Sequence, residues 1–396
     1  MKNYNNKVGD YTITSFVYSK KGKQLSNKRA LYHIKDRLIG YDVDSDKIYQ
    51  VPNPPISVAL CPTSICVRSC EFCSNTNRNR INSKNNIMYS ESIFRNIIND
   101  LNRLGVRGVS IAGGGEPLTY PQGVLYELLA NKENTFKIGL HTNGVLLDRI
   151  LTSDILYSQS IDYINVSVIA HTPSLYSKVC GADEEQFKHV ENNLKLALKY
   201  QKQFDTFPTF GVKVLLSRSN YKYVSELYSY FYNLGITNIL LRCVGNFEEN
   251  QDVELYDNQK AELINILKGS LHLTDKQING IVNANDNEGL PIPSRCWINA
   301  LQYTAGIDPD GKVFLCSQWS REGFEIGNVN EKEFIDIWNS ERHAQIVEKL
   351  NCKLKCGECS PLSCRHYYTN LAIDAYVMGM IPALEGDLNQ NYGRFI

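Results

Sequence analysis

Residues 59–75, ALCPTSICVRSCEFCSN, contain four of the twelve cysteines of the chain. Cys66, Cys70 and Cys73 form CxxxCxxC. The aromatic Phe72 comes directly before the last of them. Three thiolates this close together can hold three irons of a cubane iron–sulfur cluster, and the fourth iron can then bind a small molecule.

The alternative for this stretch is a zinc knuckle. Structural zinc sites take four ligands, usually from CxxC pairs. Cys61 could supply a fourth thiolate, but it lies at the end of the apolar run 56–60 and breaks the usual spacing. We therefore favour an iron–sulfur cluster on the three cysteines of the motif.

Short apolar runs alternate with helical patterns along the chain that surrounds and follows the motif. The runs are rich in Val and Ile, as buried parallel strands should be. They are 56–60, 107–112, 136–142, 162–169, 209–217 and 237–243. Six repeats of strand and helix imply a parallel sheet with right-handed crossovers, and six strands are too few to close an eight-stranded barrel.

The helical patterns between these runs have recognisable ends. Ser90 can cap a helix whose apolar residues recur at helical spacing, and Gly105 would end it. Residues 183–203 and 220–234 show the same kind of spacing.

The segment CVRSCEFC resembles the signature of the radical S-adenosylmethionine (radical SAM) enzymes, and the resemblance covers about residues 56–364. It implies an α/β fold, the partial (β/α)6 TIM-type barrel of that family. It also implies a [4Fe–4S] cluster that binds S-adenosylmethionine and, once reduced, yields a 5′-deoxyadenosyl radical. That radical would take a hydrogen atom from the substrate. A flavodoxin or ferredoxin-type reductant would supply the electron.

A glycine-rich stretch follows the second predicted strand. Gly113, Gly114 and Gly115 allow positive φ and close approach of the backbone to a ligand. In the family such a stretch, ending in Glu-Pro, contacts the amino group of the cofactor's methionine part. Here the Glu116 carboxylate would accept a hydrogen bond from that amino group. The alternative is a tight turn without a ligand.

Four other residues are candidate cofactor contacts: Phe72, Asn143, Ser167, where the family often places a polar contact, and Arg218, which could reach the cofactor carboxylate or the substrate. The turn HTNG around Asn143 resembles the family's Thr-Asn-Gly turn. The aspartate that often follows the serine is absent, because Ser167 is followed by VIA. Arg218 follows the fifth strand and suits a solvated loop equally well.

Two cysteines lie apart from the others. Cys243 ends the sixth predicted strand, so its side chain can face the barrel mouth, and Cys180 follows the fourth strand. A free cysteine is usually a small buried hydrophobe. The functional alternative is a hydrogen-atom donor to a substrate radical, as in some radical SAM epimerases.

Six cysteines gather between 296 and 364. IDPDGKVFLC, which ends at Cys316, predicts a hairpin turning at Asp310-Gly311 that brings Cys296 and Cys316 together. The region resembles the SPASM/Twitch extension of radical SAM enzymes, without its full cysteine spacing. The resemblance implies one auxiliary [4Fe–4S] cluster, held by Cys296, Cys316, Cys356 and Cys359, with Cys364 or Cys352 able to replace one of these. A zinc site is the alternative.

Charge and composition restrict the partners. The 42 basic and 42 acidic side chains cancel, which disfavours a nucleic-acid partner. No apolar stretch is long enough to span a membrane, and the N-terminus lacks a signal peptide. We therefore expect a cytoplasmic protein, in which the twelve cysteines suit metal ligands better than disulfides.

These patterns predict four regions. They are an N-terminal hairpin extension (1–55), a partial barrel (56–245), a helical connector (246–295) and an auxiliary-cluster domain (296–396). The resemblance implies an oxidative modification, such as dehydrogenation or bond formation, of a small metabolite, sugar or peptide. The alternatives are a radical epimerase with a cysteine donor and a non-enzymatic iron–sulfur or zinc redox sensor.

Overall fold

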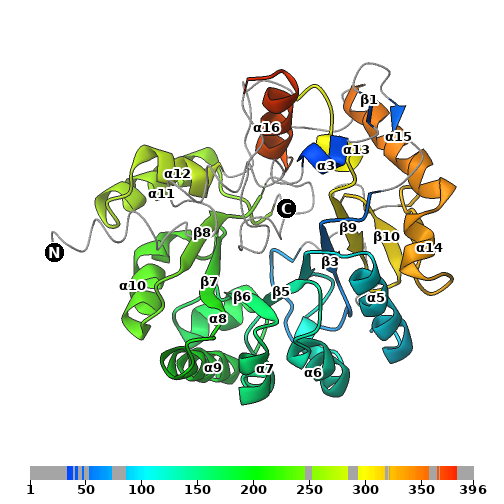
Figure 1. Ribbon diagram of the computed structural model, residues 1–396. Coiled ribbons are helices and arrows are strands. Elements are labelled where there is room, and N and C mark those ends of the chain that lie inside the picture. Colours follow the sequence, from blue (N-terminus) through cyan, green and yellow to red (C-terminus); the bar gives the residue numbers. More distant parts are fainter. Residues whose placement is uncertain are drawn as a thin grey trace.

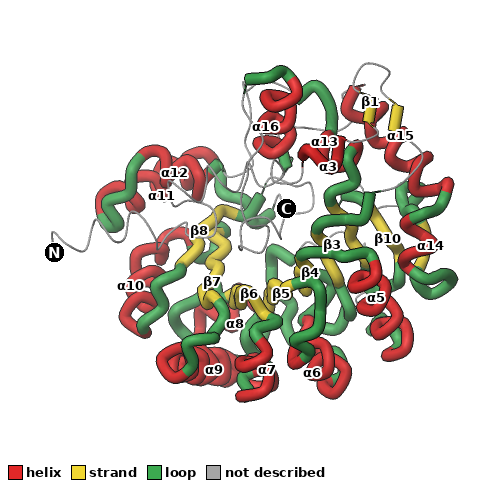
Figure 2. The backbone as a smooth tube through the Cα atoms, in the orientation of Figure 1, coloured by secondary structure: helices red, strands yellow, loops and turns green. Residues whose placement is uncertain are grey.

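A nine-stranded sheet forms the centre of the protein, with strand order β11-β10-β9-β3-β4-β5-β6-β7-β8. The computed structural model describes residues 34–38, 41–42, 47–48, 53–73, 86–245, 252–283, 293–316, 320, 322–355, 364 and 366–380. The sheet bends into an arc, and helices α5 to α10 lie on its outer side (Figures 1 and 2). This is the partial TIM-type barrel that the sequence predicted.

Six strands of the arc are parallel, and each pairs with the next. They are β3 (Ser57–Leu60), β4 (Gly108–Ile111), β5 (Lys137–Thr142), β6 (Ile161–Ser167), β7 (Thr209–Leu216) and β8 (Ile239–Cys243). Every one coincides with a predicted run to within two residues at each end. The runs were recognisable because the outward-facing residues of these strands are apolar and buried under the helices.

The connections between these strands contain the outer helices. They are α5 (Glu91–Arg103), α6 (Gln122–Ala130), α7 (Ser153–Ser158), α8 (Pro173–Cys180), α9 (Glu184–Gln203) and α10 (Val224–Leu234). Ser90 caps α5 by accepting a hydrogen bond from the Ile93 amide at 3.2 Å. Gly105 follows the helix with φ +68°. Both ends of α5 were predicted.

The two faces of the arc differ in chemistry. Outward-facing residues such as Leu140, Val166 and Val214 are fully buried in the core that the helices cover. Many of the inward-facing residues are polar, and most of these polar residues remain partly exposed. We call this side the concave face; its polar members on β5 to β8 are His141, Tyr163, Asn165, Ser167, Lys213 and Arg242.

The chain that follows the barrel completes the same sheet. Its elements are α11 (Asp257–Gly269), α12 (Asp275–Val282), α13 (Trp297–Ala300), β9 (Thr304–Ile307), β10 (Lys312–Phe314), β11 (Gly327–Asn328), α14 (Phe334–Trp338), α15 (Glu341–Lys355) and α16 (Tyr367–Val377). β9 pairs in parallel with β3 and antiparallel with β10. The predicted hairpin is therefore present, with Gly311 at φ +86°.

The described part of the N-terminal region contains a hairpin of β1 (Tyr41–Asp42) and β2 (Lys47–Ile48), and a helix that was not predicted, α3 (Ile34–Leu38), precedes it. Ile34 is buried against α13 and α16, and the Arg37 guanidinium donates to two backbone carbonyls near the end of α13. Contact with the distant C-terminal region stabilises this short helix, and no local pattern reveals that contact.

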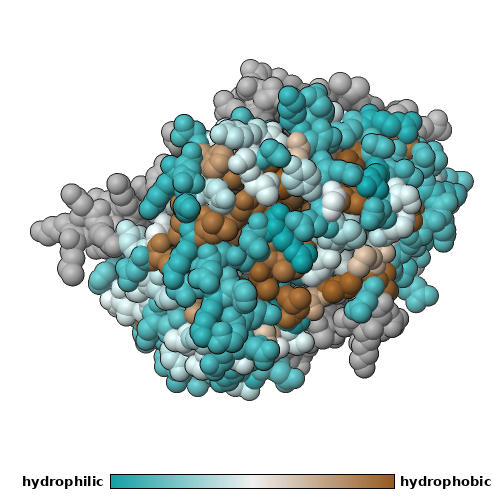
Figure 3. Space-filling view, turned by 90° about the horizontal axis from the view of Figure 1, so that it is seen from below, coloured by the Kyte–Doolittle hydropathy of each residue, from teal (hydrophilic) through white to brown (hydrophobic). Residues whose placement is uncertain are grey.

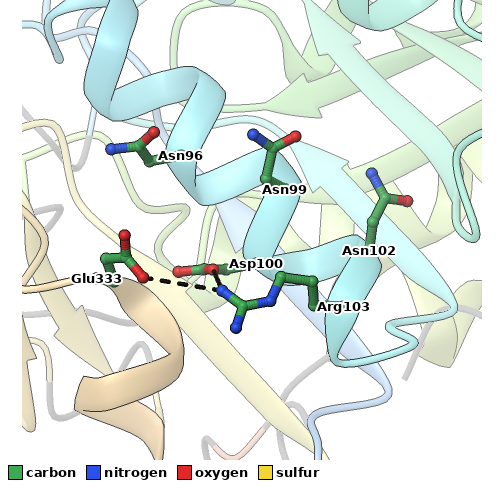
Figure 4. Close-up of a pocket in the computed structure, with 6 residues that line it drawn as sticks. All are labelled: Asn96, Asn99, Asp100, Asn102, Arg103 and Glu333. Atoms are coloured by element: carbon green, nitrogen blue, oxygen red, sulfur yellow. Dashed lines mark hydrogen bonds and ion pairs between the residues drawn. The ribbon is translucent and has the colours of Figure 1, made fainter.

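The face of the protein seen in Figure 3 is largely hydrophilic, with several hydrophobic patches between the polar side chains. On the outer side a polar depression of about 550 Å³ lies where α5 meets the start of α14 (Figure 4). It is lined by Asn96, Asn99, Asp100, Asn102, Arg103 and Glu333. Among the described residues, no helix has the length and apolar character that crossing a membrane requires.

Candidate functional site

The loop that follows β3 carries the three cysteines of the motif. Cys66 is exposed, and Cys70 and Cys73 are partly buried. The protein atoms around the Cys66 thiol partly exclude water from it, and this desolvation raises its pKa. The neighbouring thiols of Cys70 and Cys73 add to that rise. The three thiols therefore lie close enough to influence one another. We call residues 61–73 the cysteine loop.

The glycine-rich stretch lies directly against the cysteine loop. The Gly115 amide donates to the Thr63 carbonyl at 2.7 Å, and the Glu116 amide donates to the Ile65 carbonyl at 2.7 Å. A Cβ atom on Gly115 would lie 2.0 Å from the Ile65 oxygen. The sequence predicted close approach to a ligand, and the structure shows close approach to the loop itself.

Glu116 joins this stretch to the turn after β5. Its side chain is only 2% exposed. The Thr142 hydroxyl and the Asn143 amide each donate to the carboxylate at 2.6 Å. Burial raises the pKa of Glu116, while these hydrogen bonds act in the opposite direction.

Arg68 connects the cysteine loop to two more strands. Its guanidinium donates to the Asn143 carbonyl at 2.6 Å and to the Ser167 carbonyl at 3.1 Å. It also lies over the ring of Tyr176, 4.8 Å from the centroid. Sequence reasoning missed this buried cation, because its position in the motif accepts many residue types.

Glu71 provides a further anchor, at the end of β7. Its two carboxylate oxygens accept hydrogen bonds from Ser217 at 2.6 Å and from Ser219 at 2.9 Å. The cysteine loop is thus held to the carboxyl ends of β4, β5, β6 and β7. The residues between the cysteines make most of these contacts.

Cys180 packs against the cysteine loop. The Ser69 amide donates to the Cys180 carbonyl at 2.9 Å. The interaction between the thiols of Cys180 and Cys70 lowers the pKa of Cys180 and raises that of Cys70. Cys180 is fully buried at the end of α8 and does not belong to the concave face.

Cys243 differs from its expected orientation. It pairs with Leu216 and lies on the same side of β8 as Leu241, within the core that the outer helices cover. Burial raises its pKa to about 12. The strand alternation directs Cys243 away from the barrel mouth, because the concave positions on β8 are Leu240 and Arg242.

Of the remaining predicted cofactor contacts, Asn143 and Ser167 lie near the cysteine loop or on the concave face, while Arg218 is bound elsewhere. Asn143 donates to the Cys66 sulfur at 3.9 Å, and Ser167 lies on the concave face. Phe72 is partly buried and packs against the core. Arg218 is instead bound to the carbonyls of Asp252 and Glu254, and stacks on the Tyr256 ring before α11.

The donor set of the cysteine loop fits an iron–sulfur cluster. It offers three thiols on one loop, one of them exposed, at the open ends of parallel strands. In the portion of the chain that the structure describes, no three side chains converge as the ligands of one metal ion would. A cubane cluster takes each thiolate on a different iron.

The C-terminal cysteines are only partly described. Cys296 precedes α13, Cys316 follows β10, and both are partly buried, as is Cys364. Cys356 and Cys359 lie outside the described residues, and so does the side chain of Cys352.

Two family models match the chain. Residues 60–251 match the radical SAM superfamily, and residues 296–360 match an iron–sulfur cluster-binding domain, SPASM. The first match contains the cysteine loop and β4 to β8. The second contains Cys296, Cys316, Cys352, Cys356 and Cys359 and ends before Cys364.

Two curated proteins are similar in sequence. The tungsten-containing aldehyde ferredoxin oxidoreductase cofactor-modifying protein of Pyrococcus furiosus is 26% identical over 326 residues, 75% of this chain and 85% of that protein. A probable GTP 3′,8-cyclase of Methanococcus aeolicus is 31% identical over 149 residues, 36% of this chain and 47% of that protein.

Two solved structures share the fold. anSMEcpe with bound AdoMet and Kp18Cys peptide has a TM-score of 0.53 at 15% identity, covering 82% of this chain and 98% of that one. Streptococcus suis SuiB bound to its precursor peptide SuiA has a TM-score of 0.53 at 14% identity, covering 85% and 74%. At such low identities the likeness concerns the fold alone.

Proposed function

Because the chain belongs to the radical SAM superfamily and carries a SPASM domain, we propose that it oxidatively modifies a small metabolite, sugar or peptide. Its cofactors are a [4Fe–4S] cluster with S-adenosylmethionine in the first domain and an auxiliary iron–sulfur cluster in the second. When bound, the first pair supplies a 5′-deoxyadenosyl radical that removes a substrate hydrogen atom.

One observation carries this proposal: the anchoring of the cysteine loop at the open ends of the strands. Cys66, Cys70 and Cys73 would be the cluster ligands. Glu116 and Arg68 bind the loop and the strand ends to one another, so the ligands are held in fixed positions. We propose that Gly113, Gly114, Asn143 and Ser167 line the cofactor site beside them.

The placement of the thiols favours oxidation over epimerisation. An epimerase of this kind needs a cysteine that can return a hydrogen atom to the substrate radical. Cys180 is buried against Cys70, and Cys243 lies in the outer core. The C-terminal cysteines would instead hold an auxiliary cluster, which would supply the electron-transfer chemistry that a net oxidation needs.

The similar proteins support both a small molecule and a peptide as the kind of substrate. The relative from Pyrococcus furiosus is described as cofactor-modifying, and the two solved structures were determined with bound peptides. We therefore propose a small molecule, sugar or peptide as the substrate, with a flavodoxin or ferredoxin-type protein as reductant.

Anaerobic reconstitution tests the first-domain chemistry. The reduced wild-type protein should convert S-adenosylmethionine to 5′-deoxyadenosine, and Cys70→Ala should abolish this. Cys61→Ala is the matched control, since we place Cys61 outside the ligand set, and it should keep the iron content. A wild-type protein with an intact cluster and no 5′-deoxyadenosine would refute the proposal.

A second experiment separates oxidation from epimerisation. Peptides and metabolites that raise the yield of 5′-deoxyadenosine would be incubated in heavy water and their products analysed by mass spectrometry. Oxidation gives a product without solvent deuterium at the attacked carbon. Deuterium incorporation that disappears in Cys180→Ala or Cys243→Ala would show an epimerase.

The auxiliary ligand set has its own test. We propose Cys296, Cys316, Cys356 and Cys359, which the SPASM match contains, as the ligands. Replacing any two of them with alanine should lower the iron content by about half, because one of two four-iron clusters is lost. Cys364→Ala should not. A loss of iron in Cys364→Ala would place that residue in the set.

A further inference from the structure

Two cations lie on neighbouring strands of the concave face. Lys213 on β7 pairs with Leu240 on β8, and Arg242 pairs with Leu215, two residues after Lys213. Paired residues on adjacent strands point to the same side of a sheet. Lys213 and Arg242 therefore face the barrel interior from diagonal positions.

Lys213 has no hydrogen bond or ion pair with any described residue. Burial, together with the positive charge of Arg242, lowers its pKa to about 8. No carboxylate among the described residues offsets either effect. A partly buried cation without a counter-charge costs free energy, and an anionic ligand would recover it.

Uncommitted polar groups surround this pair of cations. Ser167 is in register with Lys213 across β6 and β7, and Asn165 lies two residues earlier on the same side. Neither the Ser167 hydroxyl nor the Asn165 amide has a hydrogen bond within the described residues. The strand register also brings the end of β6 beside Asn143, which contacts the Cys66 sulfur.

We propose that Lys213 and Arg242 bind an oxyanion of the substrate, a carboxylate or a phosphate. This assignment rests on the proposed function and narrows it to an acidic substrate. Arginine's planar fork suits two oxygens of one such group, and lysine adds a point charge. Asn165 would donate a further hydrogen bond. The anion would hold the substrate below the cofactor site, with its reacting carbon toward the cysteine loop.

Anion binding can be measured without turnover. Reconstituted protein would be titrated by calorimetry with inorganic pyrophosphate and with citrate. Lys213→Met and Arg242→Met should each weaken binding by about tenfold or more, the usual effect of losing a charged hydrogen bond. Lys213→Arg should retain binding. Lys199→Met, on the exposed side of α9, is the matched control and should bind like the wild type.

A second measurement on the wild type avoids any folding defect of the variants. Acetic anhydride would be used to acetylate lysines, and mass spectrometry would follow each site. Pyrophosphate should slow acetylation of Lys213 several-fold and leave Lys199 unchanged. Equal slowing at both lysines, no slowing at either, or unchanged affinity in Lys213→Met would overturn the proposal.

The cofactor's own carboxylate is the competing source of the anion. Lys213→Met should weaken the binding of pyrophosphate far more than it weakens the binding of S-adenosylmethionine. If Lys213→Met loses affinity for S-adenosylmethionine and keeps its affinity for pyrophosphate, the two cations bind the carboxylate of the cofactor, and the substrate assignment fails. A wild type that forms no 5′-deoxyadenosine would refute the proposed function, while the anion titration would still be interpretable.

Discussion

Arg68 and Glu71 stand between the motif cysteines, at positions that the motif itself leaves open. Each nevertheless holds the cysteine loop to the strand ends, Arg68 through two carbonyls and Glu71 through two hydroxyls. The motif predicts which atoms bind iron. Its intervening residues determine how firmly those atoms are held, and only the fold reveals their partners.

Glu71→Ala should make the first cluster more labile. The substitution removes both hydroxyl hydrogen bonds and frees one side of the loop, at a cost of about 1–3 kcal/mol in the free energy of unfolding. Iron release to a chelator should be several-fold faster than in the wild type. Glu133→Ala, at an exposed turn, is the control. Equal release rates in both variants would contradict this role for Glu71.

His343 makes stability depend on pH at the junction of α14 and α15. It is buried, and its Nδ1 lies 2.5 Å from the Trp338 carbonyl oxygen. Burial lowers its pKa from 6.5 to about 4. Between pH 4 and pH 6.5, His343 therefore binds a proton in the unfolded chain but not in the folded chain. Stability from this residue is present above pH 6.5 and is lost as the pH falls toward 4.

The expected loss over that window is about 3 kcal/mol. Urea unfolding at several pH values should show it in the wild type. His343→Gln should depend less steeply on pH, because glutamine does not titrate. If wild type and variant show the same pH dependence of the free energy of unfolding, His343 is not the responsible group.

At the scale of elements, α5 of the barrel caps α14 of the C-terminal region. The buried carboxylate of Asp100 accepts from the Ile335 amide at 3.2 Å and from the Arg103 guanidinium at 3.1 Å. Arg103 also reaches Glu333 at 3.8 Å, and Figure 4 shows this chain of charges. The cap places a side chain from the barrel at the first turn of a helix outside it.

Asp100→Ala should destabilise the protein by about 1–2 kcal/mol, as losses of helix caps do. Its effect should appear in hydrogen exchange of α14 as well as in global unfolding. Asn99→Ala, on the exposed side of the same helix, should have little effect. An Asp100→Ala protein with unchanged protection in α14 would show that the cap is not needed.

The elements were predictable to different degrees, for physical reasons. The six barrel strands have apolar residues on a local period, so their runs stood out. The orientation of Cys243 was not predictable, because a run of mostly apolar residues does not reveal which side of the strand faces the helices. The helix α3 and the pairing of β9 with β3 depend on contacts between distant segments, and no local pattern encodes them.

At the scale of the whole molecule, β9 unites the barrel and the C-terminal region in a single sheet. All three tryptophans, Trp297, Trp319 and Trp338, lie in the C-terminal region of the sequence, while the described helices are spread over the barrel and the regions before and after it. Tryptophan fluorescence therefore reports on the C-terminal region, and far-UV circular dichroism reports on the whole protein.

We expect the two signals to change together during denaturation. The shared strands β3 and β9, and the cap on α14, should make unfolding a single cooperative transition. Guanidinium titrations followed by both signals would measure this. A fluorescence change at clearly lower denaturant than the loss of helix would show that the C-terminal region unfolds independently.

The parallel pairing of β3 with β9 also has a cost during translation. Ser57 leaves the ribosome early, and its partner Thr304 is made only after most of the chain. At roughly 5–20 residues per second, the nascent first strand waits on the order of ten seconds or more with one edge uncovered. Ribosomes stalled before residue 304 should therefore present a chain that chaperones bind, and ribosomes stalled beyond residue 340 should present one that they release.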